Sequence, residues 1–387
     1  MARRLFLVAV TTGIVLLTLG PATPPPEMTS GPCCLTPDLV LNIMLFVPFG
    51  IALGLVRRRV PIAVAIGALL STAIEILQLW IPGRDSAISD VAANSLGTLF
   101  GALVVWGWPA RHRWWKIPGL AVAAIVVGAS VTASFLVRPA LPSPAVWWGQ
   151  WAHDFYRTLP FEGQVLGFNL QGIPIGDGRV GQGEHLNAGL AQRDTIRLEA
   201  RIISGPPVPG RAQLIGLVAD GPGGEYVNLW QEGRSLRTFV RLRLNDAGLR
   251  SPWLRLRDAL PGSAGDTVEI SATVTRRQVL LSAHHPGGSM QRAFDLSAAT
   301  FWGAFFPSEF DFGSRVPSRS LIPITLSFGG LGAGIRSRIA MVLASLVALL
   351  AGPVLAGTAF PAAVSLAAAV FGVGAGRWIA FRLGLLR

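Results

Sequence analysis

Seven apolar segments, most of them long enough to cross a membrane as a helix, dominate this sequence. About 20 apolar residues, at a rise of about 1.5 Å each, span the hydrocarbon core of a bilayer. Charged residues make up only 14% of the chain, which is low for a soluble protein. The expected spans are residues 5–19, 39–56, 61–81, 91–108, 117–137, 339–355 and 362–380. The sequence therefore predicts an α-helical polytopic membrane domain embedded in a lipid bilayer.

The pattern changes between the fifth and sixth apolar segments. Short runs of alternating apolar and polar residues follow one another there, separated by Gly, Pro and Asp, which is typical of antiparallel strands and turns. The runs are residues 165–170, 195–203, 212–220, 225–230, 237–244, 266–274, 277–284 and 290–296. So many short strands predict an all-β jelly-roll sandwich.

Four regions follow from these patterns. We expect a transmembrane domain of about five spans (1–137), a linker (138–160), a β-sandwich (161–335) and a C-terminal transmembrane hairpin (336–387). Three tryptophans of the linker are expected at the membrane interface, where this side chain is enriched. They are Trp147, Trp148 and Trp151.

The net charge of +12 does not indicate a nucleic-acid-binding protein, because of where the charges lie. Residues 150–335 hold 18 Arg and 16 acids, whereas the rest of the chain holds 15 basic residues and 5 acids. The N-terminus and the loops 57–59 and 111–116 carry eight basic residues and no acid. The positive-inside rule places those loops in the cytoplasm, and an odd number of spans then makes the sandwich extracytoplasmic.

Both ends of the chain leave a question open. The first apolar segment is short, and we interpret it as a retained helix, with a cleaved signal peptide as the alternative. At the other end, a two-span hairpin after an external domain would leave basic residues on the outer side, against the charge rule. They are Arg336, Arg338, Arg377, Arg382 and Arg387. The sequence therefore does not fix the orientation of this hairpin.

Polar residues interrupt the second to fourth spans. They are Asn42, Glu75, Gln78, Arg84, Asp85, Asp90 and Asn94. Ionisable groups at membrane depth are costly and mark candidate functional sites. The predicted topology places the set near the outer face, so we expect a polar cavity that opens outward, in which Arg84 pairs with Asp90 or Glu75. The alternative is that these side chains only hold neighbouring helices together.

Small residues accompany this polar set. Gly97 and Gly101 share one helix face with Asp90 and Asn94, and such spacing allows a neighbouring helix to approach closely. Three motifs run through the region: N-x3-F-x-P-x-G, E-x2-Q and R-x5-D-x3-N-x2-G-x3-G. They comprise Asn42, Phe46, Pro48, Gly50, Glu75, Gln78, Arg84, Asp90, Asn94, Gly97 and Gly101.

These motifs resemble the VanZ-like family of bacterial membrane proteins, over residues 5–110. The resemblance implies a multi-pass protein of the bacterial inner membrane, with a role related to resistance to the glycopeptide teicoplanin. We expect Pro48, Gly50, Gly97 and Gly101 to serve helix packing.

The strand-rich region is similar in order and texture to the concanavalin-A-like and laminin-G sandwiches. That resemblance implies glycan binding on a face or rim with exposed aromatic side chains. The candidate residues are Asp220, Asn228, Trp230 and Glu232, where a calcium ion is the one cofactor we consider. The alternative is that Trp230 is a core or rim aromatic and that the acids are solvated strand ends.

The sequence favours a non-enzymatic protein that binds or handles an amphiphilic cell-envelope ligand, such as a glycopeptide, with an outer domain that binds an envelope glycan. The alternative is a membrane enzyme acting on a lipid-linked cell-wall precursor, since two carboxylates can serve as acid and base. The cluster contains no His or Cys, and we assign no catalytic or metal-binding residue. Cys33 and Cys34 are adjacent and cannot form an ordinary disulfide without strain; we interpret them as unpaired thiols, with intermolecular pairing or metal binding as alternatives.

Overall fold

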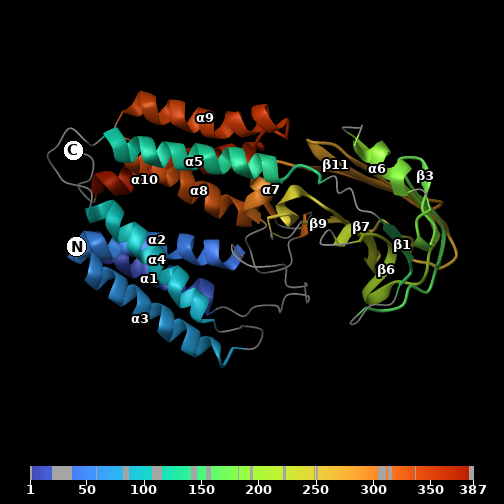
Figure 1. Ribbon diagram of the computed structural model, residues 1–387, viewed down its shortest axis with the longest axis horizontal. Helices are drawn as coiled ribbons and strands as arrows, with labels where there is room; N and C mark the ends of the chain where they lie inside the picture. The colour runs from blue at the N-terminus through green and yellow to red at the C-terminus, as the bar shows by residue number, and fades with distance from the viewer. Residues whose placement is uncertain are drawn as a thin grey trace.

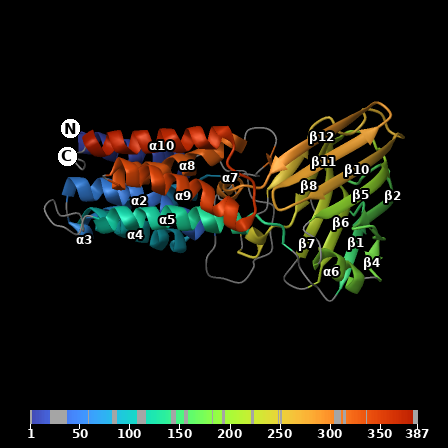
Figure 2. The ribbon, with the colours of Figure 1, turned by 90° about the horizontal axis from the view of Figure 1, so that it is seen from above.

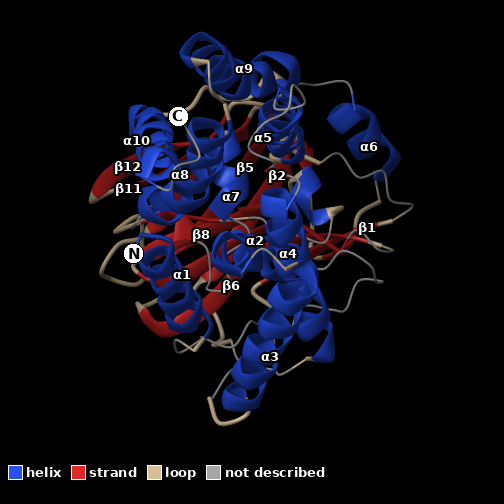
Figure 3. Ribbon diagram, turned by 90° about the vertical axis from the view of Figure 1, so that its left-hand side faces the viewer, coloured by secondary structure: helices blue, strands red, loops and turns tan. Residues whose placement is uncertain are grey.

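The molecule consists of a body of long helices and a β-sandwich at one end of it (Figures 1 and 2). The computed structural model describes residues 2–19, 37–57, 59–81, 87–106, 116–140, 146–153, 158–181, 183–191, 195–220, 224–247, 249, 252–303, 311–312, 316–335 and 337–382. Viewed from the helical side, the sheets lie behind the helices (Figure 3). The start of the first described helix, α1 (Ala2–Thr18), and the end of the last, α10 (Ala363–Arg382), lie at the end of the helical body away from the sandwich (Figure 1).

Eight long helices form the helical body in the part of the chain that the structure describes. They are α1 (Ala2–Thr18), α2 (Pro37–Arg57), α3 (Val60–Gln78), α4 (Ile88–Trp106), α5 (Lys116–Leu136), α8 (Val316–Gly334), α9 (Arg338–Ala356) and α10 (Ala363–Arg382). Three described helices, α3, α9 and α10, are long and apolar enough to cross a membrane. The seven predicted apolar segments each correspond to one helix, and α8 is additional.

Helix α8 corrects the predicted extent of the β domain. We expected the sandwich to continue to residue 335, but the last strand ends at Phe312 and a helix occupies Val316–Gly334. Its sequence is rich in Ser, Pro and Gly, and it contains no long uninterrupted apolar run. In the structure the glycines instead form the contact surface of α8 with α10: a Cβ on Gly332 would lie 2.1 Å from the carbonyl oxygen of Val373.

Glycines bring the helix backbones together in pairs, and the same geometry recurs in α2 with α4 and in α8 with α10. A Cβ on Gly97 would lie 2.2 Å from the Ile43 oxygen. On α10, a Cβ on Gly376 would lie 2.0 Å from the Gly329 oxygen. Real Cβ atoms do not approach a carbonyl oxygen so closely, so each contact requires a residue without a side chain.

Two sheets form the sandwich. The first has the order β13-β9-β8-β7-β6-β1-β4 and the second the order β12-β11-β10-β5-β2-β3. Neighbouring strands are antiparallel, except for the parallel pair β13 and β9. The strands are β1 (Trp147–Trp151), β2 (Gln164–Leu170), β3 (Ile173–Pro174), β4 (Gly178–Arg179), β5 (Ile196–Ile203), β6 (Val208–Ala219), β7 (Gly224–Gly233), β8 (Ser235–Val240), β9 (Trp253–Leu256), β10 (Thr267–Val274), β11 (Gln278–His285), β12 (Gly288–Asp295) and β13 (Asp311–Phe312). All eight predicted runs contain a strand.

Strand β1 lies within the region that we predicted to be a linker. Its first residue, Trp147, is fully buried. The Trp147 indole donates a hydrogen bond to Asn187 Oδ1 at 2.8 Å, and its ring centroid lies 5.3 Å from that of Tyr226. Asn187 belongs to the short helix α6 (Gly183–Ala191). The predicted interface position of Trp147 is therefore wrong: this side chain is part of the core of the sandwich.

Backbone hydrogen bonds fasten the sandwich to the helices. Directly after α5, Ala140 N donates to Arg241 O at 3.0 Å, and Arg243 N donates to Arg138 O at 2.9 Å. Between α9 and α10, Ala359 N donates to Leu296 O at 2.9 Å. The short helix α7 (Ala298–Gly303) packs on α5 and α8. The connection between α9 and α10 thus lies at the sandwich end of the helical body.

We predict that Gly101→Ala destabilises the protein. A Cβ on Gly101 would lie 2.1 Å from Val47 O, and relieving such a clash costs about 1–3 kcal/mol. Gly128→Ala on α5 is the control, because a Cβ there meets no described atom within 4 Å. The control should be neutral or slightly stabilising, since alanine is the better helix former. Thermal unfolding in detergent measures both, and equal melting temperatures would contradict the close packing of α2 on α4.

Candidate functional site

Glu75 lies near the C-terminal end of α3 and is bound to the start of α4. Its side chain is 7% exposed, and Oε2 accepts a hydrogen bond of 2.9 Å from Ala87 N, one residue before α4 begins. A carboxylate is favourable at this position because the first N–H groups of a helix lack intrahelical partners and carry partial positive charge. Glu75 therefore helps to fix where α4 starts.

Gln78 and Asn94 also connect helices. Gln78 Nε2 donates a hydrogen bond of 3.0 Å to Thr18 O at the end of α1. Asn94 Nδ2 donates to Ser71 Oγ at 2.8 Å, linking α4 to α3. Among the described residues, Asn94 Oδ1 has no hydrogen-bond partner. Three members of the predicted polar set thus hold α1, α3 and α4 together, as the packing alternative expected.

Two other described members of the set lie on α2 and α4. Asn42 on α2 is half-buried. Asp90, in the first turn of α4, is also half-buried and lies 3.5 Å from Ser89 Oγ. Arg84 and Asp85 lie outside the described residues, so the pairing of Arg84 with Asp90 or Glu75 stays a prediction.

A groove of ≈ 410 Å³ lies between α3 and α4. It is lined by Thr72, Glu75, Ile76, Leu79, Ala87, Ile88, Val91, Ala92 and Ser95. Of these described residues, Glu75 alone carries a charge, and most of the others are apolar. Apolar walls with one polar group suit a ligand that has an extended apolar chain and a polar end.

The groove lies at the sandwich end of the helical body. Helix α1 begins at the chain end marked N and runs toward the sandwich (Figure 1), so Thr18 lies at the sandwich end. Because Gln78 binds Thr18 O, the end of α3 and the start of α4 lie there too. Glu75 therefore has the same position along the helices as the sequence predicted, near the end that carries the β domain.

The seven-stranded sheet has a polar, aromatic face on the side opposite the sandwich core. Cross-strand partners share a face of a sheet. One row consists of Gln150, Gly216, Asn228, Phe239 and Trp253, and the next of Gln213, Trp230, Arg237 and Arg255. The row between them, of Trp151, Ile215, Leu229, Thr238 and Leu254, points to the core. We call the first side the amide face of the sheet.

Aromatic rings cover part of the amide face. Trp230 is half-buried, and its ring lies 6.1 Å from that of Trp253 in an edge-to-face arrangement. Trp253 also contacts Phe239, at 5.5 Å between centroids, and the Arg237 guanidinium lies 5.1 Å above its ring. Trp230 is therefore not a residue of the sandwich core, and it lies beside a buried cation.

The four predicted glycan-binding residues do not form one cluster. Asn228 and Trp230 share the amide face, as does Glu232. Glu232 forms ion pairs with Arg255, with Arg237 at 3.5 Å and with Arg211 at 3.8 Å. Asp220 lies at the opposite end of the β6–β7 hairpin, where Oδ1 accepts a hydrogen bond of 2.9 Å from Val146 N.

Two neighbouring side chains of β7, Glu225 and Tyr226, have raised pKa values. Burial raises the pKa of the Glu225 carboxyl, and a hydrogen bond with the Asn228 side chain partly offsets this rise. Burial also raises the pKa of Tyr226 well above its ordinary value. No group of three His, Cys, Asp or Glu side chains suited to a metal ion occurs among the residues that the structure describes.

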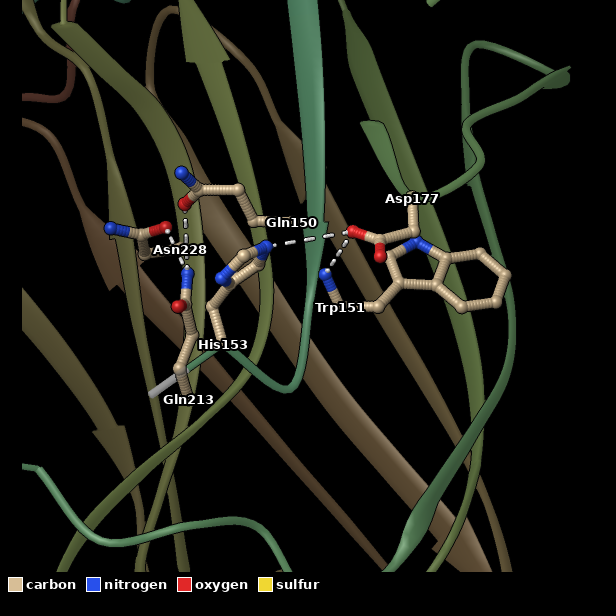
Figure 4. A network of polar contacts seen from close by, with 6 residues as sticks. All are labelled: Gln150, Trp151, His153, Asp177, Gln213 and Asn228. Atoms are coloured by element: carbon tan, nitrogen blue, oxygen red, sulfur yellow. Dashed lines mark hydrogen bonds and ion pairs between the residues drawn. The ribbon is translucent and has the colours of Figure 1, made fainter. Parts of the chain in front are cut away.

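One polar cluster of the β domain was not predicted from the sequence. Gln150, Gln213 and Asn228 come from three different strands and meet on the amide face (Figure 4). A signal was present, because Gln213 and Asn228 each interrupt a strongly apolar run. Their meeting was not predictable, since it depends on the register between β1, β6 and β7.

The comparisons with known proteins bear on the helical body. Residues 9–111, which cover most of α1, all of α2 to α4 and the residues that follow, match the VanZ/LLP1 family model. This part of the chain is a VanZ/LLP1 domain. No curated protein and no solved structure matches the chain. The VanZ resemblance is confirmed over this range and suggests a glycopeptide-resistance-like role, while the concanavalin-A-like or laminin-G identity of the sandwich stays a prediction.

We predict that Glu75→Leu lowers the free energy of unfolding by about 1–3 kcal/mol, because it leaves the Ala87 N–H without its acceptor. Glu75→Gln retains an oxygen at this position and should lose less. Thr72→Ala, one turn earlier, is the control, since the Thr72 hydroxyl bonds only within its own helix in the described contacts, to Ala68 O. If thermal unfolding finds Glu75→Leu as stable as the control, Glu75 does not hold the start of α4.

Proposed function

We propose that this protein spans the bacterial inner membrane with eight helices and binds an amphiphilic cell-envelope ligand from the outer side. The observation that supports it most is the groove between α3 and α4, with its apolar walls and the single carboxylate of Glu75. The family match of this region to VanZ/LLP1 adds a glycopeptide-resistance-like context.

The charge distribution supports this orientation. Arg3 Nη1 lies 3.4 Å from Leu55 O, which brings the start of α1 to the end of α2. Arg377 Nη1 donates to Ile335 O at 3.3 Å, which brings the end of α10 to the end of α8. Basic residues thus gather at the end of the helical body away from the sandwich. The positive-inside rule puts that end in the cytoplasm.

The additional helix α8 removes the conflict between the basic residues of the C-terminal hairpin and the positive-inside rule. With three helices after the sandwich instead of two, α8 returns the chain to the basic end before α9 begins at Arg338. The end of α10, with Arg377 and Arg382, then lies on the same side as the N-terminus (Figure 1). The basic ends of α1, α2, α5, α9 and α10 agree with one topology, in which the sandwich is extracytoplasmic; Arg319, in the first turn of α8, is the exception.

The groove between α3 and α4 and the amide face of the sheet together indicate the class of ligand. The groove suits an acyl or prenyl chain, and its polar end faces outward, where the sandwich lies. The amide face, with its tryptophans, has the composition of a glycan-binding surface, since sugars offer hydroxyl groups and an apolar ring face. An amphiphilic glycopeptide or a glycolipid has both parts.

Binding of teicoplanin and of its deacylated core to the full chain in nanodiscs tests the proposal. We expect the acylated compound to bind at least about tenfold more tightly, because only it fills the groove. Ala92→Trp fills the groove and should remove that difference, whereas Ala124→Trp on an exposed position of α5 should not. Equal affinities of the two compounds for the wild-type protein would contradict the proposal, and turnover of the probe would favour the enzymatic alternative.

The topology predicts which single cysteines an impermeant thiol reagent labels in intact spheroplasts. In a background in which Cys33 and Cys34 are replaced by serine, Ser289→Cys on the exposed strand β12 should be labelled. Ser337→Cys, between α8 and α9, should be labelled only after the membrane is permeabilised. The reverse pattern would place the sandwich in the cytoplasm and refute the outward-facing groove.

A further inference from the structure

The contacts between α8 and α10 repeat those between α2 and α4, position by position. In each pair, two glycines of the second helix face carbonyl oxygens of the first, and one glycine of the first helix faces a carbonyl oxygen of the second. The contacts are Gly97 with Ile43, Gly101 with Val47 and Gly50 with Thr98 in one pair, and Gly372 with Thr325, Gly376 with Gly329 and Gly332 with Val373 in the other. One constant shift in residue number relates α2 to α8, and another relates α4 to α10. The two helix pairs therefore have the same packing register.

The pattern of burial repeats along the same helices. Residues 43–51 of α2 and 325–333 of α8 show the same succession of buried, half-buried and exposed side chains. Phe46 and Phe328 hold the same buried position in it. The last five residues of α3 and of α9 also agree with each other. Because burial depends on the neighbours that surround a helix, this agreement indicates that the counterpart helices have equivalent surroundings.

The counterpart helices follow one another in the same order along the chain. Helix α1 packs on α2 as α5 packs on α8, and α2 and α8 both run away from the sandwich. Viewed along the helices, the pairs α2–α4 and α8–α10 lie on opposite sides of the helical body, with α2 and α8 on the inside (Figure 3). Two parallel repeats related by an axis along the membrane normal have this arrangement. One helix differs, since α3 packs on α4 whereas α9 packs on α5.

The sandwich belongs to the second set of helices. It is inserted between α5 and α8, the position that the connection between α1 and α2 has in the first set. One cluster of buried apolar residues continues from α5, α8, α9 and α10 into the sandwich, whereas those of α1 to α4 form a separate cluster. The second set therefore carries the β domain.

The second set keeps the packing residues and lacks most of the polar ones. With α3 and α9 matched at their last residues, the counterparts of Asn42, Glu75, Gln78, Asp90 and Asn94 are Ile324, Pro353, Ala356, Ser365 and Ala369. Of these five counterparts, Ser365 alone is polar and none is charged. The carboxylate that lines the groove of the first set thus has no equivalent at the counterpart position of the second.

We propose that α5, α8, α9 and α10 are a second copy of the VanZ four-helix unit, interrupted by the sandwich, and that the two copies have different tasks. The first copy, α1 to α4, holds the ligand between α3 and α4. The second copy has kept the helix packing, has lost the polar groups and anchors the sandwich to the membrane. The assignment of the ligand to the first copy rests on the proposed function and deepens it, because it limits the chain to one groove site.

Valine substitutions in the full chain test the repeat itself. Gly329→Val gives α8 the residue that α2 has at the counterpart position, Val47, and a Cβ there lies at an ordinary 3.5 Å from Gly372 O. We therefore expect no fall in melting temperature. Gly332→Val is the matched control, because its counterpart is Gly50 and a Cβ on either glycine would lie 2.1 Å from a carbonyl oxygen. Gly332→Val and Gly50→Val should both melt at lower temperatures than the wild-type protein. If Gly329→Val melts as low as Gly332→Val in nanodiscs, the two helix pairs are not equivalent and the inference is overturned.

Tryptophans at counterpart positions test the division of tasks. Ala92 lines the groove, and Ala367 is its counterpart on α10; both are exposed. We expect Ala92→Trp to remove the preference of at least about tenfold for acylated over deacylated teicoplanin, and Ala367→Trp to retain it. Titration calorimetry in nanodiscs should also find one bound teicoplanin per wild-type chain.

Loss of the preference in both tryptophan variants, or two bound molecules per chain, overturns the assignment of the ligand to the first copy. A wild-type protein that shows no preference refutes the proposed function instead. In that case the melting temperatures of the valine variants still decide whether the two sets of helices form a repeat.

Discussion

The close approach of helix backbones at glycines is the constraint on which the helical body depends. Because Gly97 and Gly101 lie against carbonyl oxygens of α2, helix α4 can have only one position and rotation relative to its neighbour. That rotation turns Asn94 toward Ser71 and brings the start of α4 to Glu75. The groove between α3 and α4 is therefore a consequence of the packing of α2 on α4. In a membrane, where burial of apolar surface gives little drive for helix association, such contacts and a few interhelical hydrogen bonds carry the specificity.

The sequence left two roles open for the polar residues of the VanZ domain, helix packing and ligand binding, and both apply. Gln78 and Asn94 connect helices, which is the packing interpretation. Glu75 also connects helices, through Ala87 N, but in addition lines the groove. A carboxylate that is held in place by a structural hydrogen bond is a rigid group for a ligand to meet. Structural and functional roles are thus compatible in one side chain.

The sequence predicted the helices and strands that have a strong local pattern, and missed those that depend on tertiary contacts. Long apolar runs such as α3 and α9 were found almost to their ends. Helix α8 was missed because its glycines resemble a turn sequence, and only the contact of Gly332 with α10 shows their purpose. Strand β1 was missed because its tryptophans also suit a membrane interface. Once β1 is placed beside β6, Gln150 joins Gln213 and Asn228 in one polar cluster.

Photochemical cross-linking of an acylated ligand tests the central claim most directly. Teicoplanin with a diazirine at the end of its acyl chain would be bound to the nanodisc-embedded protein, irradiated and mapped by mass spectrometry. We predict labels in residues 72–79, at the end of α3, and in residues 87–95, at the start of α4, which are removed by excess unmodified teicoplanin but not by its deacylated core. Labels that are spread over other apolar helices such as α9, and that are insensitive to the competitor, would contradict this claim.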